Sequence, residues 1–573
     1  MLLHYEKGLV GEESLINDPS FFLSPKGRVS PEEELKATIQ AFYQTPETQC
    51  KFPARKHWLN EQLQFPSLPN VDCSDYQNYL EAFGAQSISL VYASGYLGNP
   101  ASMYGHVLLK FNNSENHEYL DNTFNYGARV PEDDNKLVYI FQGITGGYQG
   151  YYANQKYHHQ NLTYSESELR DLWEYRLKLS EQDVTFVLAH LWELENASMT
   201  YYFFTENCAY QLAKLLELVI DAPLVAKNKL WVMPYDVIVM LNDANGGHYI
   251  DEVIYHGSRQ EHLYNRYKQL DDDEKLSVQY ITEQGIENIP AHLDSHDEVS
   301  AKKIIDTLYD YYAFVDVKNS GLMEEQTKKR KLLLTKRFLL PPGDIQWSDP
   351  EQSPPHHSQN TAMLQVSPLY NDAFGKGLEL RFRANYYDML NLNAARIPYS
   401  QLNTFDLRLL YEIDEDKWHF RELTLFDILN LNVSQTGLQE DKRYAWGVSA
   451  GYRPTSLDCA DCSDAYVSGL IGKGWEFIGG FAGYAALTSE LQVGSFKEAN
   501  VLGGIEIGGV VTASPYWASS IKIGSQIYVN DSAEYKNYLV WEQRVFANRH
   551  VDFRTSVRYD EAFEYAANFS LYW

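Results

Sequence analysis

The feature that most constrains this 573-residue chain is a series of about twelve segments of alternating polarity after residue 360. Each segment has about ten residues and is bounded by turn residues, which predicts antiparallel strands with one apolar and one polar face. In residues 551–559, apolar or bulky side chains alternate with Asp552, Arg554, Ser556 and Arg558. We expect strands near 361–369, 376–388, 401–413, 418–430, 443–453, 464–473, 475–487, 499–512, 516–529, 536–547, 550–559 and 564–573.

An antiparallel transmembrane β-barrel of about 12 strands accounts best for this pattern. A soluble β-sandwich also alternates, but these segments are long and follow one another as hairpins without a crossover. Many carry an aromatic residue near an end, as strands do at membrane interfaces. The last segment ends on Trp573, which resembles the C-terminal signature of bacterial outer-membrane barrels. A closed barrel is one of two structures that can span lipid.

An even number of strands predicts where the rest of the chain lies. The first and last strands then open to the same side, which in outer-membrane proteins is the periplasm. We therefore expect the N-terminal part in the periplasm, where disulfides form. No window of 18 apolar residues free of charge predicts a membrane helix. The stretch "MLLHYEKGLVGEES" lacks the pattern of a signal peptide.

Charge and motifs argue against several classes of ligand. Asp and Glu outnumber Lys and Arg by 77 to 48, a net charge of −29, so we expect no nucleic-acid partner. The sequence "GITGG" at 143–147 lacks the Lys-Ser/Thr of a phosphate-binding loop. The pair His158 and His159 lies outside any metal-binding spacing. We expect neither a cofactor nor a metal.

The periodicity divides the chain into five parts. Residues 1–85 predict a helical N-terminal extension, residues 86–245 strands (86–130) followed by helices (165–245), and residues 246–340 a helical connector. Residues 341–360, rich in Pro, Ser and His, form the best linker, and residues 361–573 form the barrel. The order of elements in residues 86–245 predicts an α+β domain.

The five cysteines form two near pairs and a singleton. We expect Cys50 with Cys73 and Cys459 with Cys462 to form disulfides in an oxidising compartment, which leaves Cys208 free. The alternative for "CADC", at 459–462, is half of a zinc site, but no second pair with ligand spacing exists.

Cys208 lies where a polar stretch becomes a helical pattern, so we place it in the first turn of a helix. The unsatisfied N–H groups and the dipole there favour an anion, which predicts a lowered pKa for the thiol and a site for an oxyanion. The alternative is a small buried residue at a helix end.

A base is available in His106, at the start of a predicted strand. If the following hairpin turns at Ser114, His106 faces Asn122, which could orient the imidazole. Asn125 is the alternative if the register slips, and Glu118 has the correct parity but lies further along.

Four motifs resemble the periplasmic domain of the family typified by the Bacteroides lipoprotein N-acyltransferase: "SMYGHVLLKF", "YLDNTFNYGA", "FQGITGGYQGYY" and "YYFFTENCAYQL". The resemblance covers roughly residues 80–245. "CKFPARKHWL" also resembles an N-terminal extension of proteobacterial members. The Bacteroides type has transmembrane helices, whereas this chain carries a predicted barrel, so the resemblance bears on the reaction more than on the substrate.

The resemblance implies an α+β permuted papain-like (NlpC-like) fold, with Cys208 as nucleophile, His106 as base and Asn125 as the third residue. Asn207, Tyr104 and Tyr126 lie within the same motifs and are expected to support the site or to hold an oxyanion.

Three functions remain open from the sequence. The first is acyl transfer or hydrolysis on a membrane lipid or lipoprotein through a Cys208 thioester. The second is a peptidoglycan amidase or peptidase, because related thiol folds cut cell-wall peptides. The third is a non-catalytic barrel for transport or envelope assembly, with further envelope partners. It predicts that Cys208 lies far from His106 or is sealed from solvent.

Overall fold

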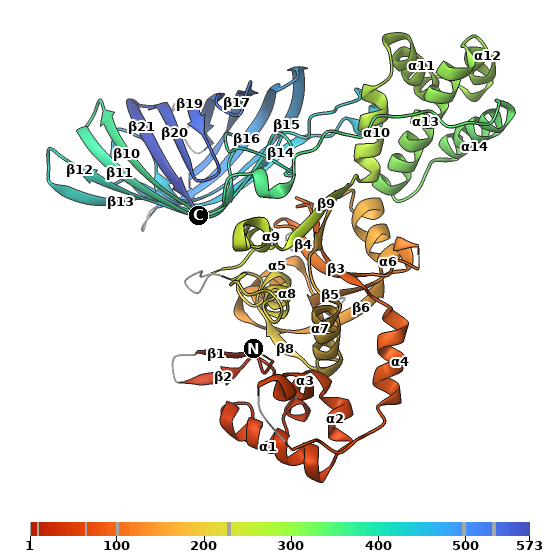
Figure 1. The fold of residues 1–573 in the computed structure, drawn as a ribbon. Helices are drawn as coiled ribbons and strands as arrows, with labels where there is room; N and C mark the ends of the chain where they lie inside the picture. Colours follow the sequence, from red (N-terminus) through yellow and green to blue (C-terminus); the bar gives the residue numbers. More distant parts are fainter. Residues whose placement is uncertain are drawn as a thin grey trace. The chain divides into compact units, whose positions relative to one another are not determined.

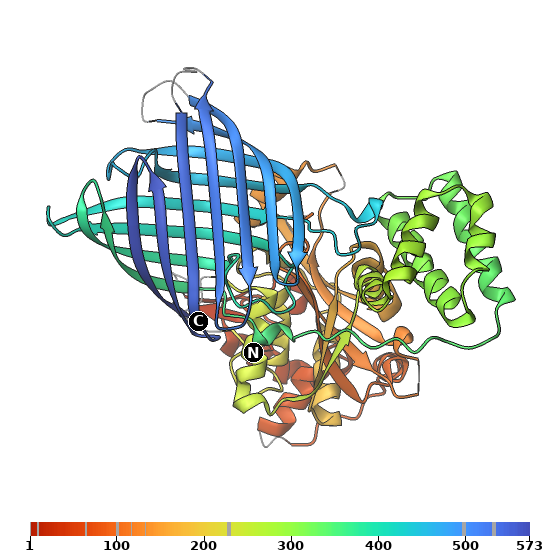
Figure 2. The same ribbon diagram turned by 90° about the horizontal axis from the view of Figure 1, so that it is seen from above.

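The computed structural model describes residues 2–7, 11–62, 66–98, 102–115, 117–131, 133–225, 231–494, 500–529 and 535–573. The chain forms two compact units (Figures 1 and 2). The first consists of Met1–Ser258 with Pro354–His356, and the second of Arg259–Ser353 with His357–Trp573.

The first unit begins with a hairpin and four helices: β1 (Tyr5–Lys7), β2 (Glu12–Ser14), α1 (Pro31–Gln44), α2 (Thr48–Lys51), α3 (Pro53–Gln62) and α4 (Ser74–Phe83). Helix α1 starts as its sequence predicts, because the Ser30 hydroxyl accepts a hydrogen bond from the Glu33 N–H. A disulfide between Cys50 and Cys73 joins α2 to the residue before α4. This bond confirms the first predicted cysteine pair.

A seven-stranded antiparallel sheet follows, in the order β8-β6-β5-β4-β3-β7-β9. Its strands are β3 (Ser87–Ala93), β4 (His106–Asn112), β5 (Asn122–Ala128), β6 (Tyr148–Lys156), β7 (Leu172–Leu177), β8 (Met199–Tyr201) and β9 (Ile250–His256). The α-helices of this part are α5 (Lys136–Thr145), α6 (Tyr157–Asn161), α7 (Glu181–Glu193), α8 (Cys208–Leu216) and α9 (Pro234–Asp243). The arrangement is α+β, as expected, and the permuted papain-like topology stays a prediction.

Two strands depart from the expected organisation. The segment Leu172–Leu177 was expected to be helical, but it forms β7 between β3 and β9. It is buried on both faces, so it lacks the alternation that identifies a half-exposed strand. Strand β9 pairs with β7 and extends the first unit past the expected boundary at residue 245. The helical connector therefore begins at Arg259.

The second unit opens with five helices: α10 (Arg259–Lys268), α11 (Asp272–Glu283), α12 (Ile289–Leu293), α13 (Glu298–Lys318) and α14 (Glu324–Leu339). Helix α10 contacts the loop between the fourth and fifth barrel strands, because the Tyr264 hydroxyl donates to Asp441 Oδ1 at 2.6 Å. In the part of the chain that the structure describes, no helix is long and apolar enough to cross a membrane.

The remainder is a closed barrel of twelve antiparallel strands that follow one another in chain order (Figures 1 and 2). They are β10 (Met363–Asn371), β11 (Gly375–Tyr387), β12 (Ser400–Glu412), β13 (Lys417–Asn430), β14 (Ala445–Pro454), β15 (Ser463–Ile478), β16 (Phe481–Val493), β17 (Asn500–Thr512), β18 (Ala518–Tyr528), β19 (Tyr535–Ala547), β20 (Val551–Asp560) and β21 (Ala562–Tyr572). The predicted barrel and its strand number are confirmed.

The two faces of the barrel follow the alternation in the sequence. Along β21, Phe569 and Leu571 are 49% and 45% exposed, whereas Asn568 and Ser570 are 6% and 0% exposed. The apolar residues point outward, where lipid replaces water as the neighbour, and the polar residues point into the lumen.

Only one pair of predicted barrel segments is misplaced by more than a few residues. A turn was expected near residue 474, but β15 continues to Ile478 and the turn lies at Gly480. Gly472 and Gly474 are strand residues at close backbone approaches: a Cβ would lie 2.1 Å from the Ala485 carbonyl oxygen and 2.5 Å from that of Leu431. These glycines serve packing and do not mark a turn.

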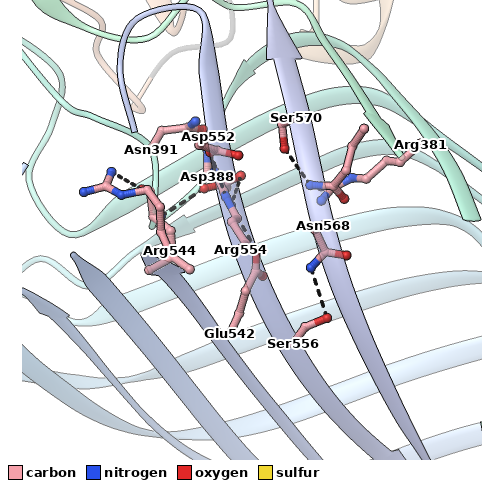
Figure 3. A network of polar contacts seen from close by, with 12 residues as sticks. Arg381, Asp388, Asn391, Glu542, Arg544, Asp552, Arg554, Ser556, Asn568 and Ser570 are labelled. Carbon is pink, nitrogen blue, oxygen red and sulfur yellow. Dashed lines mark hydrogen bonds and ion pairs between the residues drawn. The ribbon is translucent and has the colours of Figure 1, made fainter. Parts of the chain in front are cut away.

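The connection between β11 and β12, residues 388–399, folds into the lumen (Figure 3). Asp388 forms ion pairs with Arg383 at 2.8 Å and with Arg554 of β20 at 3.0 Å. Leu390 is 2% exposed, packs with residues of β16, β17 and β18, and accepts a hydrogen bond from Arg544 of β19 through its carbonyl oxygen. This segment is called the inner loop below. It lies at the end of the barrel where β10 begins and β21 ends.

Candidate functional site

The start of α8 is held by Asn207. Its side-chain oxygen accepts hydrogen bonds from the N–H groups of Ala209 and Tyr210 at 3.0 and 3.1 Å. Its amide nitrogen donates to the carbonyl oxygens of Phe203 and Val232 at 3.0 and 2.6 Å. The side chain thus caps the helix that begins with Cys208, and its role toward an oxyanion stays a prediction.

Cys208 is the first residue of α8 and is 5% exposed. Burial raises the pKa of its thiol to about 11, although the N–H groups of Val107 and Ala209 act on the sulfur in the opposite direction. The expected lowering at a helix N-terminus is therefore present, but desolvation outweighs it. At neutral pH the substrate-free site holds a thiol.

The contact between the Val107 N–H and the sulfur places Cys208 next to the strand that carries the predicted base, His106. Val107, whose N–H faces the sulfur, directly follows His106, the first residue of β4. His106 Nε2 is buried and has no hydrogen-bond partner among the described residues. Burial, and then the charge of Arg170, lowers the pKa of His106 to about 3. The imidazole is thus neutral at physiological pH and can accept a proton.

The predicted orienting residue Asn122 does not face His106. Strand β4 pairs with β5 through Leu109 and Phe124, and Asn122 pairs with Phe111. Five residues of strand, about 17 Å, separate Phe111 from His106. The register differs because a 3₁₀ turn, Glu118–Leu120, lengthens one side of the connection. Asn125 lies one residue beyond the last pair and stays a prediction as the third residue.

Tyrosine rings surround the sulfur. Tyr126 is fully buried, and its hydroxyl has no hydrogen-bond partner among the described residues. Burial, and then the charges of Glu206 and Cys208, raises its pKa. Its ring lies 5.8 Å from that of Tyr201, which also neighbours Cys208 electrostatically. The other expected supporting residue, Tyr104, packs its ring against Phe204 at 6.1 Å.

Arg170 and Tyr164 belong to this site but were not predicted. The guanidinium lies 4.9 Å from the Tyr164 ring, and that ring lies 5.5 Å from His106. Arg170 falls in the stretch that was expected to be helical, and Tyr164 directly precedes that stretch. If β7 had been recognised in the sequence, Arg170 would have been placed just before the start of a strand of the same sheet as His106.

The second predicted cysteine pair is wrong. Cys459 and Cys462 are both free, and the Cys462 thiol donates to the Cys459 carbonyl oxygen at 3.6 Å. The two thiols also interact with each other through a side-chain hydrogen bond, but no disulfide joins them. Among the described residues no group of three or more His, Cys, Asp or Glu side chains could hold a metal ion.

Three family models match the chain. Residues 75–244 match the Lnb N-terminal periplasmic domain, residues 352–573 a domain of unknown function named DUF7840, and residues 1–62 another named DUF7843. The resemblance stated from the motifs is thereby confirmed: residues 75–244 form an Lnb N-terminal periplasmic domain, fused in this chain to a closed 12-stranded barrel. No curated protein compared with the chain matches it.

Solved structures match the barrel. An outer-membrane channel from Pseudomonas putida F1 is 11% identical with a TM-score of 0.24, over 39% of this chain and 99% of the channel. The channel DcaP of Acinetobacter baumannii is 8% identical with a TM-score of 0.19, over 37% of this chain and 97% of DcaP. These values carry no argument about function. The periplasmic family and the barrel confirm the predicted location, the outer membrane with the N-terminal domain in the periplasm.

Proposed function

We propose that the Lnb-type domain is a cysteine enzyme that transfers or hydrolyses an acyl group of a lipid or lipoprotein at the periplasmic side of the outer membrane. The observation that supports this most is the meeting of Cys208 with the His106 strand end, through the Val107 N–H. The two elements in contact, β4 and α8, carry a buried imidazole nitrogen that has no partner among the described residues and a free thiol.

The chemistry follows from the neutral state of both groups. His106 takes the proton of the Cys208 thiol as the sulfur attacks the acyl carbonyl carbon. The bond from that carbon to the leaving oxygen or nitrogen breaks, and His106 returns the proton to the leaving group. Water or an amine then attacks the thioester and releases Cys208, again with His106 as base. The N–H groups of Val107 and Ala209 lie where they could stabilise developing negative charge.

The surroundings of Cys208 support an acyl-chain substrate over a cell-wall peptide. Aromatic rings lead from Tyr126 through Tyr201 and Phe203 to Tyr139 of α5, at successive distances of 5.8, 6.0 and 4.9 Å. On the surface of α5, Phe141 is 68% exposed. Apolar side chains of this kind bind alkyl chains, whereas a peptide substrate calls for polar partners.

The burial of Cys208 sets a condition on this function. At 5% exposure, an acyl group reaches the sulfur only when a neighbouring side chain moves. A sealed thiol is also what a non-catalytic domain predicts, so activity has to be measured directly.

Replacement of Cys208 by Ala tests the proposal. Lipids, lipoproteins and wall fragments of cells expressing the wild type or the variant are compared by mass spectrometry. We expect the variant to lose a change in lipid or lipoprotein acylation that the wild type produces. Cys459→Ala, which removes another free thiol, is the matched control and should behave as the wild type. A change confined to wall fragments would favour the amidase, and no change in any fraction would exclude both enzymes.

A further inference from the structure

Arg170 is held with little freedom beside the candidate site. It is 2% exposed, and each of its three nitrogens makes a hydrogen bond. Nε donates to the Ser94 carbonyl oxygen at 2.6 Å, Nη2 to that of Ala93 at 3.0 Å, and Nη1 to Glu168 at 2.7 Å. Such a fork of donors fixes both the side chain and the backbone that it binds.

The backbone that Arg170 holds is the strand end beside the base. Ala93 is the last residue of β3 and pairs directly with His106 across the sheet. Tyr164 forms a second link, because its ring contacts both groups, at 4.9 Å from the guanidinium and 5.5 Å from the imidazole. A change at Arg170 therefore reaches His106 through the strand pair and through the ring.

Arg170 also acts on the site through its charge. It is the charged side chain that lowers the pKa of both His106 and Cys208. At His106 this effect adds to burial, whereas at Cys208 it opposes burial. A cation at this place stabilises a thiolate and disfavours an imidazolium, so the two residues respond in a coordinated way.

We propose that Arg170 is the positioning residue of the Cys208–His106 pair: it fixes the His106 strand end, stabilises the thiolate, and favours release of the proton from the imidazolium to the leaving group. The proposal rests on the proposed function. The thiol proton moves to His106, the sulfur keeps the electron pair, and the proton then passes to the leaving group. Arg170 itself neither gains nor loses a proton.

Several other titratable side chains lie near Cys208, His106 and Arg170. Tyr126, Tyr164 and Tyr201 neighbour Cys208 and stay protonated, because burial raises the pKa of each. Glu206 acts electrostatically on Tyr126 and on Tyr210. Glu168 is paired with Arg170 and its side chain is 28% exposed, so it neutralises part of the guanidinium charge from the outer side.

Alkylation of Cys208 tests the proposal without requiring turnover. The full chain, with Cys459→Ser and Cys462→Ser as background, reacts with iodoacetamide between pH 7 and 9, and mass spectrometry follows modification of Cys208. The rate reports the thiolate fraction. Arg170→Gln should react about ten-fold more slowly at each pH, because loss of the cation raises the pKa of the thiol.

Two further variants separate charge from structure. Arg170→Lys loses the fork of donors but keeps the charge, so it should restore most of the rate. Glu168→Gln removes the compensating anion and should speed the reaction; it also covers the case in which Arg170→Gln does not fold. Arg176→Gln, which alters an exposed arginine paired with Glu252, is the matched control and should not change the rate.

The outcomes keep this inference distinct from the proposed function. Equal rates for Arg170→Gln and Arg176→Gln, or slowing to the same extent by Gln and Lys, would overturn the charge coupling. If the coupling is found but Cys208→Ala alters no lipid, lipoprotein or wall fragment, the proposed function fails and so does the assignment of Arg170 to a reaction. If both are found, Arg170→Gln should lower kcat with little change in KM, since Arg170 acts through other residues.

Discussion

The Cys208 site and the ion-pair cluster around Arg554 in the barrel lumen both bury polar side chains, but they differ in how these side chains are paired. Around Cys208, His106 Nε2 and the Tyr126 hydroxyl are buried without hydrogen-bond partners among the described residues. In the lumen, Arg554 is 1% exposed and contacts Asp388, Glu542 and Asp552 within 3.0 Å (Figure 3). Paired buried charges hold one arrangement, whereas unpaired neutral groups leave binding capacity for a substrate.

The difference also concerns what each region can do. The inner loop is tied to strands on several sides of the lumen, through Asp388, Leu390 and Asn391. Interior side chains just fill a barrel of about eight strands, and a barrel of twelve strands is wider. The inner loop occupies part of this additional space in the lumen, and the N-terminal domain carries the proposed reaction site.

The largest expected effect is that of Arg554→Gln. The change leaves Asp388, Glu542 and Asp552 without their shared cation, and breaking a buried ion pair in this way costs about 3–5 kcal/mol. Heat- or urea-induced loss of the folded barrel, followed by gel mobility, should occur under much milder conditions. Lys417→Gln, which breaks an exposed pair with Asp461, is the matched control and should leave the barrel unchanged. Equal stability of the two variants would show that the lumen pairs do not hold the barrel.

The next effect concerns conductance. The wild type should give no stable current in planar lipid bilayers, because the inner loop fills one end of the lumen. Replacement of residues 390–397 by a Gly-Ser linker should open a pore. Replacement of residues 413–416, the turn between β12 and β13, is the matched control and should leave the barrel closed. A conducting wild type, or a closed variant without the inner loop, would contradict the assignment of this segment as the seal.

Much of the fold was predictable because its periodicity is simple. Lipid outside and polar groups inside impose strict alternation on every barrel strand, so twelve strands were found with most ends within a few residues. Ser30 and Pro31 likewise mark the start of α1 by local chemistry alone. Strand β7 was missed because burial on both faces removes the alternating signal.

The site was predictable in its residue types but not in its energetics. Cys208 and His106 were identified from motifs, and the structure brings their elements together. The direction of the Cys208 pKa was predicted wrongly, because a helix N-terminus is visible in sequence and burial by distant elements is not. Asn122 was misplaced because the length of each side of a connection depends on its turns. Arg170 lies in none of the recognised motifs, and its place beside the site depends on the pairing of β3 with β4.

A smaller effect, of opposite sign, is expected at Gln211, on α8 one turn after Cys208. It is fully buried, and neither atom of its amide has a hydrogen-bond partner among the described residues. Gln211→Leu keeps the volume and removes the unsatisfied groups, so it should stabilise the domain by about 1–2 kcal/mol. Gln160→Leu is the matched control and should destabilise, because that buried amide donates to Gln155. Urea unfolding followed by fluorescence measures both, and destabilisation by Gln211→Leu would reveal a partner for its amide.

The smallest effect is expected from two neighbouring tyrosines whose rings lie 5.0 Å apart. The Tyr152 hydroxyl donates to the Gln211 carbonyl oxygen at 3.1 Å, whereas the Tyr126 hydroxyl has no partner among the described residues. Tyr152→Phe should therefore cost about 1 kcal/mol, and Tyr126→Phe should change the free energy of unfolding by less than that or raise it. If Tyr126→Phe leaves stability intact but lowers acyl turnover, its hydroxyl serves the substrate. Equal destabilisation by both changes would mean that the Tyr126 hydroxyl is paired, and the contrast between the Cys208 site and the Arg554 cluster would not hold at this residue.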